Sequence, residues 1–257
     1  MRFGDLGNES LTEQTMARHG CKDSGKQELH EFFIRRSKMT LEEFRKKAAE
    51  NEEWAPGWDA IDDAFDKIYP GVNPTHYATD LVKRSMFGGD QFLDGYSFFP
   101  SPKGYWHLVT YGMTFLYTEE EQLGEEWNKW GYEMTMKLKE DDIQNCLFAT
   151  DFLSNIARYT YNTGKYFEPY HFINFNGPIR SSYDTNITAV LAVSDTEVEG
   201  VDTIYGRTDF IQFVGITSEE YEMLRENPSK AGELAERLKA DYPDLETDLN
   251  RTKSYVF

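Results

Sequence analysis

The segment Gly131–Lys139 constrains the fold more than any other stretch of the sequence. Its apolar residues alternate strictly with polar ones, as Tyr132, Met134, Met136 and Leu138 against Glu133, Thr135, Lys137 and Lys139. Because successive side chains of a strand point to opposite faces of its sheet, this pattern predicts a strand with one apolar and one polar face. Strands of parallel sheets read as continuous apolar runs, so we expect this one to be antiparallel and half-buried.

Helix signals flank further strand-like segments. Thr40 with Glu43 and Thr217 with Glu220 form capping boxes, and Pro56 suits the first position of a helix. The predicted helices cover 40–50, 56–68, a stretch from Asp142 or Asn145 to Gly164, 217–227 and 229–239. The predicted strands cover 106–113, 131–139, 171–175, 187–193, 209–216 and, at the end of the chain, 254–257. The fold class is therefore α+β, with a mixed, mainly antiparallel sheet packed with helices.

Charge divides the chain into two parts. Residues 1–53 hold ten Lys or Arg against eleven Asp or Glu, whereas residues 54–257 hold 17 against 34, a net charge of −17. Only four of the aromatic residues precede residue 54. We predict a leader at 1–53, a poorly ordered tail plus one helix, and a folded domain at 54–257. Met39, directly before the capped helix, is an alternative start of the native chain.

The net charge of −18 argues against two classes of partner. Nucleic acids and anionic membranes are bound through basic surfaces, which this composition does not supply. No apolar run resembles a signal peptide or a membrane span. The two cysteines, Cys21 and Cys146, have no metal-ligand spacing, which suits a reducing compartment. We expect a cytoplasmic protein that binds neither nucleic acid nor membrane.

Motifs for catalysis are missing from the sequence. It has no phosphate-binding loop, nucleophile elbow, zinc-protease motif or calcium loop. His107 and His171 each stand at the start of a predicted strand, and each is either a catalytic base or metal ligand or, as we favour, a packed histidine. We predict no catalytic residue, no metal site and no cofactor. The alternative, an uncharacterised hydrolase, requires a polar cleft around His107, Glu133 and Asp94.

Several aromatic residues fall outside the predicted core pattern. They are Phe98, Phe99, Tyr105, Trp127, Trp130, Tyr166, Phe167 and Tyr170. Tyr and Trp side chains often anchor protein–protein interfaces, so we interpret these residues as candidates for protein recognition.

A series of short motifs, in this order, resembles the suppressor-of-fused family. They are Gly57–Ile61, Tyr69–Gly71, Gly88–Asp90, Leu93–Gly95, Trp106–Gly112, Leu116–Tyr117, Gly131–Thr135, Leu153–Tyr159, Asn176–Ile179 and Asp209–Thr217. Single motifs are weak signals, but their number and order over about 55–257 make the resemblance specific. It implies a non-catalytic binding module that corresponds to the N-terminal lobe of the two-lobed animal proteins.

The resemblance also implies a binding site and a role. In the family, a ligand segment docks as an added strand between the two lobes, and the stretch that contacts it maps onto Tyr159, Phe167 and His171. The animal proteins carry an acid at the position of His171. Single-lobe bacterial members are thought to be immunity proteins, which implies a protein that occludes a cognate toxin. A basic toxin domain would suit the acidic charge. The alternative is a regulatory adaptor that sequesters another protein.

Overall fold

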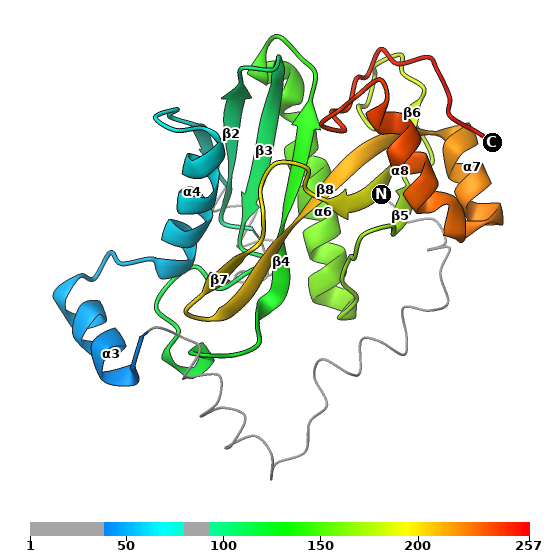
Figure 1. The fold of residues 1–257 in the computed structure, drawn as a ribbon. Coiled ribbons are helices and arrows are strands. Elements are labelled where there is room, and N and C mark those ends of the chain that lie inside the picture. Colours follow the sequence, from blue (N-terminus) through cyan, green and yellow to red (C-terminus); the bar gives the residue numbers. More distant parts are fainter. Residues whose placement is uncertain (1–38, 80–92) are drawn as a thin grey trace.

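The computed structural model describes residues 39–79 and 93–257, and Figure 1 shows their arrangement. An eight-stranded sheet has the order β1-β2-β3-β4-β8-β6-β5, with β7 paired to β8. The strands are β1 (Thr75–Ala78), β2 (Gly95–Ser101), β3 (Tyr105–Tyr111), β4 (Trp127–Leu138), β5 (Phe172–Asn174), β6 (Ile187–Ser194), β7 (Val201–Thr203) and β8 (Gly206–Thr217). The expectations for the tail, Cys21 and the motif at Gly88–Asp90 lie outside the described residues.

The sheet is mixed and mainly antiparallel, as predicted. Strands β1 to β4 form an antiparallel meander, and β6 is antiparallel to both β5 and β8. These two antiparallel parts meet where β4 pairs with β8 in parallel. The α+β class is therefore confirmed, and the parallel pair lies at the junction between the two parts.

The five α-helices of the described residues begin and end close to the signals in the sequence. They are α3 (Leu41–Glu50), α4 (Pro56–Ile68), α6 (Phe148–Thr163), α7 (Ser218–Glu226) and α8 (Ala231–Lys239), with short 3₁₀ turns at Glu120–Gln122, Ile143–Cys146 and Pro228–Lys230. Thr40 and Thr217 each form the expected capping box. Gly164 ends α6 with a φ of 72°, a left-handed conformation that glycine adopts without strain.

The helices cover the two faces of the sheet unequally. Helix α6 packs on one face, against apolar residues from β2, β3, β4, β5, β6 and β8. The other face is shared: α4 covers β2 and β3 at one end, and α7 with α8 covers β5, β6 and the end of β8 at the other (Figure 1). A stretch of β4 and β8 therefore lies between two groups of helices.

Helix α3 lies at one end of the molecule and is held by aromatic packing. The ring of Phe44 lies 5.2 Å from Trp54 and 6.5 Å from Tyr205, measured between ring centroids. An exposed ion pair joins Arg45 to Glu120. The division of the chain at residue 53 remains a prediction.

Three sequence-based expectations are wrong. The strand over 131–139 is neither half-buried nor purely antiparallel, because both faces of β4 are covered and its neighbour β8 runs parallel to it. Residues 254–257 form no strand. Most of the aromatic residues expected in recognition loops belong to the core instead: Phe98, Phe99, Tyr105, Tyr166 and Phe167 are all buried, and Tyr170 alone of the eight is exposed.

Candidate functional site

The polar face of β4 is completely buried. Glu133, Thr135 and Lys137 alternate with apolar residues as the sequence predicts, yet none of the three is exposed. They lie on the face shared by α4 and the α7–α8 pair, where the segments at 195–198 and 244–247 cover the space between the helices. Because an ionised group loses its hydration when buried, each of these charges needs partners within the protein.

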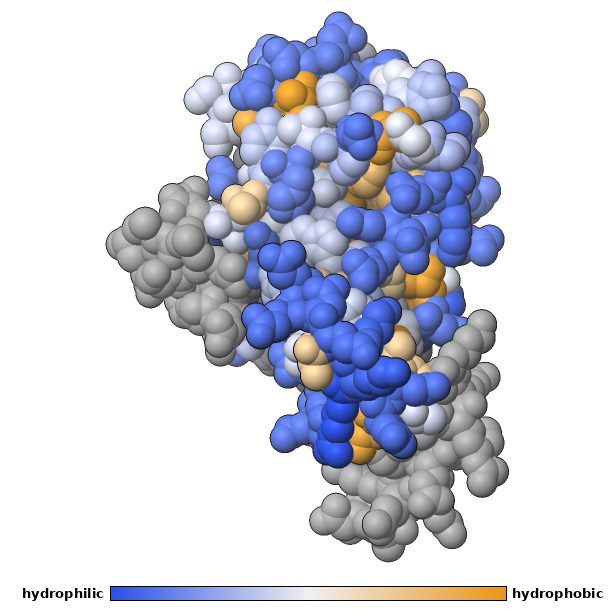
Figure 2. All heavy atoms as spheres, turned by 90° about the vertical axis from the view of Figure 1, so that its left-hand side faces the viewer, coloured by the Kyte–Doolittle hydropathy of each residue, from blue (hydrophilic) through white to orange (hydrophobic). Residues whose placement is uncertain are grey.

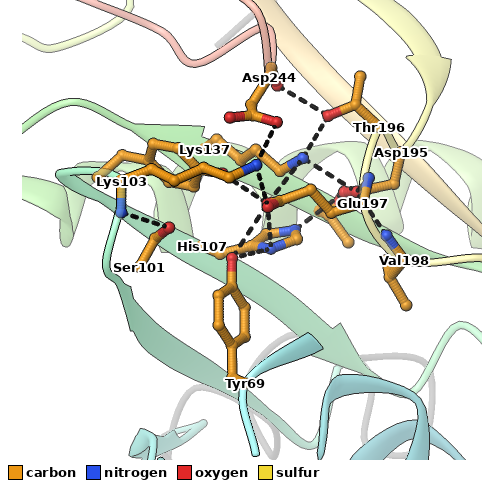
Figure 3. Close-up of polar contacts among 12 residues, drawn as sticks. Tyr69, Ser101, Lys103, His107, Lys137, Asp195, Thr196, Glu197, Val198 and Asp244 are labelled. Carbon is orange, nitrogen blue, oxygen red and sulfur yellow. Dashed lines mark hydrogen bonds and ion pairs between the residues drawn. The ribbon is translucent and has the colours of Figure 1, made fainter. Parts of the chain in front are cut away.

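Asp195 is the centre of a buried charge cluster, which we define as Asp195, His107, Lys137 and Glu197 (Figure 3). Its carboxylate contacts five nitrogen or hydroxyl groups at 2.5–3.1 Å: Lys137 Nζ, His107 Nε2, Thr135 Oγ1 and the backbone amides of Glu197 and Val198. Three elements, β3, β4 and the loop after β6, are thereby joined through one side chain.

Glu197 forms the outer part of the buried charge cluster. Its Oε2 accepts hydrogen bonds from the hydroxyls of Tyr69, at 3.1 Å, and Tyr105, at 2.6 Å, and lies 3.2 Å from Lys137 Nζ. Its Oε1 accepts from Lys103 Nζ at 2.8 Å. The side chain of Lys103 is 50% exposed and that of Glu197 12%, so the cluster reaches solvent at Lys103.

Electrostatics keep both carboxylates ionised. Burial by itself would raise the pKa of Asp195, but the charges and hydrogen bonds of His107 and Lys137 outweigh it and hold the pKa far below its ordinary value. Burial also opposes ionisation of Glu197, whose hydrogen bonds from Lys103 and Tyr105 and the nearby charge of Lys137 lower its pKa to about 2. Asp195 and Glu197 are therefore anions held by fixed donors.

Glu133 is a further buried carboxylate on this face, and its hydrogen-bond partners differ from those of Asp195 and Glu197. It accepts hydrogen bonds from four uncharged donors: Thr110 Oγ1 and Thr114 Oγ1 at 2.7 Å, and the amides of Gly112 and Thr114 at 3.0 Å. Burial raises the pKa of Glu133, and these hydrogen bonds only partly oppose that rise. The carboxylate fixes the turn that follows β3.

These contacts remove the basis for the hydrolase alternative. His107 is fully buried between Asp195 and Tyr69, whose hydroxyl lies 3.0 Å from Nδ1. Glu133 is fully buried among the donors of the β3 turn. The two side chains are fully buried in separate sets of structural contacts, which does not fit the accessible polar site that the hydrolase alternative requires.

The described part of the chain also lacks a metal-binding cluster and an accessible thiol. Within residues 39–79 and 93–257, no group of three or more His, Cys, Asp or Glu side chains is arranged to hold a metal ion. Cys146 is buried, and burial raises the pKa of its thiol to about 12, which leaves it protonated. In the same part of the chain, no helix has the length and apolar character needed to cross a membrane.

The three predicted partner-binding residues lie together. Phe167 is the middle of the group: its ring centroid is 6.1 Å from that of Tyr159, on α6, and 6.4 Å from that of His171, directly before β5. Phe167 is buried, whereas Tyr159 and His171 are partly exposed. The structure thus brings Tyr159, Phe167 and His171 into one aromatic cluster beside the terminal strand of the sheet.

β5 ends the sheet at this cluster. Its backbone pairs with β6 on one side only, and the flanking contacts run from Ala192 N to His171 O, at 2.7 Å, and from Phe175 N to Thr188 O, at 3.0 Å. Because the hydrogen-bonding direction alternates along an antiparallel strand, Phe172 and Asn174 direct their backbone N–H and C=O groups away from β6. No described strand pairs with this edge.

Sequence reasoning missed several residues of the sites. It assigned no role to Lys137, Asp195 or Glu197, because a lysine on an alternating strand and acids in a loop look the same whether they are solvated or buried. It also missed the left-handed backbone of Tyr170, with a φ of 75°, at the entry to β5. The clearest sequence signal for the buried charge cluster was that Tyr69 and His107, which contact each other there, both lie in motifs that resemble the family.

Comparisons with known proteins identify the family. The model of the family "Suppressor of fused protein (SUFU)" matches residues 89–252, which is more than half of the chain. The chain therefore belongs to the suppressor of fused family. Characterised members of this family are non-catalytic proteins that bind other proteins.

Curated relatives include the Suppressor of fused homologs of Homo sapiens and Mus musculus. Each is 25% identical to this chain over 176 residues, which cover 64% of this chain and 36% of the relative. The chain thus matches only about a third of the length of these relatives.

Solved structures with the same fold include a Sufu–Fu complex (TM-score 0.66, 24% identity) and Drosophila Suppressor of Fused (TM-score 0.65, 24% identity). A third is a putative homolog from Neisseria gonorrhoeae (TM-score 0.54, 16% identity). Each match covers 78% of this chain, and covers 92%, 51% and 97% of the respective structures. These similarities confirm the fold.

Proposed function

We propose that this protein captures a segment of a partner protein as an added strand on β5 and, by covering the partner, inhibits it. The open backbone edge of Phe172 and Asn174 beside Tyr159, Phe167 and His171 is the observation that carries the proposal. In this mode the backbone supplies affinity, and the side chains on both faces of the added strand supply specificity.

Both faces next to the edge are suited to apolar side chains. Ile173 belongs to the core beneath α6, whereas Phe172 belongs to the core beneath α7 and α8. An added strand would place alternate side chains near Tyr159 on one face and near α7 and α8 on the other. Tyr170 is 52% exposed, and its ring lies beside Gly232 at the start of α8. An exposed tyrosine of this kind suits an interface anchor.

Charge favours a basic partner. The domain over 54–257 carries a net charge of −17. Figure 2 shows the face with α3 and α4 as predominantly hydrophilic, with hydrophobic residues scattered rather than gathered. Three exposed aspartates on α4 make this face acidic: Asp59, Asp63 and Asp66. An acidic surface attracts a cationic protein over a distance and speeds its encounter.

A bacterial toxin domain is the partner class that we propose, and an immunity protein acting in the cytoplasm is the corresponding role. The resemblance to single-lobe bacterial members supports this role, and the Sufu–Fu complex supports a protein ligand. Occlusion needs no catalytic group, in agreement with the enclosed contacts of His107 and Glu133.

Co-expression with each toxin encoded beside the gene tests the proposal. We expect protection of the cells, and a complex with one toxin that weakens as salt rises. Asn174→Pro removes an outward-facing amide of β5 and should abolish both protection and binding. Asn174→Ala is the matched control, since it keeps that amide and should retain both.

The outcomes separate the alternatives. Protection by both variants would overturn the β5 site. Absence of protection and of a complex with every neighbouring toxin would overturn the immunity role. A stable complex with a non-toxin protein that is lost in Asn174→Pro would instead establish the regulatory adaptor.

A further inference from the structure

His171 holds the turn that leads into β5, and it does so as a hydrogen-bond acceptor. Its Nδ1 accepts a hydrogen bond from the backbone amide of Glu168 at 3.0 Å, and its own amide donates to Glu168 O at 3.1 Å. Only a ring without a proton on Nδ1 can accept this bond. The Glu168–His171 turn, defined by these four residues, therefore requires neutral His171 protonated at Nε2.

This turn determines the position of β5. Within it, Tyr170 has a φ of 75° and donates its amide to Ala192 O at 2.7 Å, and His171 O accepts from Ala192 N at 2.7 Å. A tyrosine in the left-handed region is strained and persists only where its surroundings hold it. The paired contacts between His171 and Glu168 are the nearest such support.

We propose that protonation of His171 opens the Glu168–His171 turn and loosens the start of β5, so that acidification switches off the edge at which a partner strand docks. The effect of this switch on partner binding rests on the proposed function. The conformational change itself is a property of the free protein. A proton on Nδ1 would place one N–H donor against another, and the contact that holds the turn would be lost.

The surroundings of the ring favour the neutral form at neutral pH. Burial lowers the pKa of His171 below its ordinary value, and the carboxylate of Glu168 partly opposes this effect. The other neighbours are uncharged. The rings of Phe167 and His171 meet edge to face, Tyr159 of α6 lies on the other side of Phe167, and β6 contributes the backbone of Ala192. The side chain of His171 is only partly buried, so solvent can reach the ring.

The sign of the pH dependence follows from this shift. Because the folded state disfavours the charged ring, the unfolded turn takes up a proton more readily than the folded turn. The stability that His171 confers on the turn is therefore complete above its ordinary pKa of 6.5 and is lost as the pH falls below it. The switch would therefore operate in the acidic range below pH 6.5.

Nuclear magnetic resonance on the free, full-length protein tests the proposal. Imidazole nitrogen shifts report the protonation of His171, and amide exchange reports protection at Glu168 and Tyr170. Between pH 7.5 and pH 5.0 we expect His171 to gain a proton and the protection factor of the Glu168 amide to fall about tenfold, the size of one lost hydrogen bond. The amide of Phe213, in the core, should not change.

Two substitutions at this position separate the switch from general acid effects. His171→Asn keeps an acceptor that does not titrate and should keep the Glu168 amide protected at both pH values. His171→Phe removes the acceptor and should leave that amide unprotected at both. The proposal would be overturned if the Glu168 amide of the wild type stayed protected while His171 gained its proton. It would also be overturned if acidification removed this protection equally in His171→Asn. Because no partner is present, these results are independent of whether a toxin binds.

Discussion

Glu133 and Asp195 are both buried carboxylates on one face of the same sheet, yet the protein treats them in opposite ways. Asp195 lies between Lys137 and His107, and these contacts hold its pKa far below the ordinary value despite burial. Glu133 receives hydrogen bonds only from threonine hydroxyls and backbone amides, and burial raises its pKa. Burial alone therefore does not determine the ionisation of a side chain; the charge of its donors does.

Removing the fully buried cation should have the largest effect. In Lys137→Met, Asp195 and Glu197 keep their negative charges and lose their shared ammonium group. We expect the free energy of unfolding to fall by about 3–5 kcal/mol, the usual cost of leaving a buried charge without its partner. Urea denaturation at pH 7 measures it. A loss below about 1 kcal/mol would mean that the buried charge cluster is well hydrated.

Asp195→Asn should change the acid dependence of stability. The lowered pKa means that the unfolded chain takes up a proton before the folded protein does, so the contribution of Asp195 is complete above the ordinary carboxyl pKa and declines as the pH falls. We expect the variant to be less stable than wild type by about 3 kcal/mol at pH 7, with a difference that narrows towards pH 3. Denaturation curves at several pH values measure it, and a constant difference would contradict the assignment.

Glu133→Gln should show the opposite pH dependence and a smaller loss. The folded protein favours protonated Glu133, so its contribution is complete below the ordinary carboxyl pKa and is lost as the pH rises through the raised one. A glutamine oxygen still accepts from Gly112 and Thr114, so we expect a cost of about 1–2 kcal/mol at pH 5. The difference from wild type should shrink by pH 8, and a widening difference would be the contrary result.

Lys103→Met is the matched control for Lys137→Met and should have the smallest effect. Both lysines bind Glu197, but Lys103 is half exposed and its ion pairs with Glu197 and Asp244 are screened by solvent. We expect a change below about 1 kcal/mol in the free energy of unfolding, and one that added salt reduces. A loss equal to that of Lys137→Met would show that exposure does not separate the two sites.

The sequence allowed much of this fold to be predicted, since local signals place its elements. Two helices begin at the capping boxes of Thr40 and Thr217, as the sequence predicts. Helix α6 ends at Gly164, also as predicted. The sequence correctly predicted that apolar and polar residues alternate along β4. It wrongly predicted that the polar residues of this strand are exposed to solvent. The segments that cover the polar face of β4 contain Asp195 and Asp244, which are far from β4 in the sequence. A local sequence pattern does not predict such long-range contacts.

The candidate binding site was predictable to a different degree. The family resemblance selected Tyr159, Phe167 and His171, and the structure places them together, although their role in binding is still a prediction. Periodicity could not have selected them, because Phe167 lies in a connecting segment and is buried there. Nor could it show that Nδ1 of His171 accepts the Glu168 amide, which depends on the shape of a four-residue turn.

The parallel pairing of β4 with β8 also has a consequence for how the chain folds. Most other strand pairs join segments that are close in sequence, whereas this pair must close a loop that contains α6, β5 and β6. Closing a long loop costs chain entropy before any contact repays it, so we expect the two antiparallel parts to form early and to join late. Lys137 on β4 and Asp195 after β6 come from opposite sides of that junction. Their contact would thus form in the last step, and its loss should accelerate unfolding while leaving the refolding rate nearly unchanged.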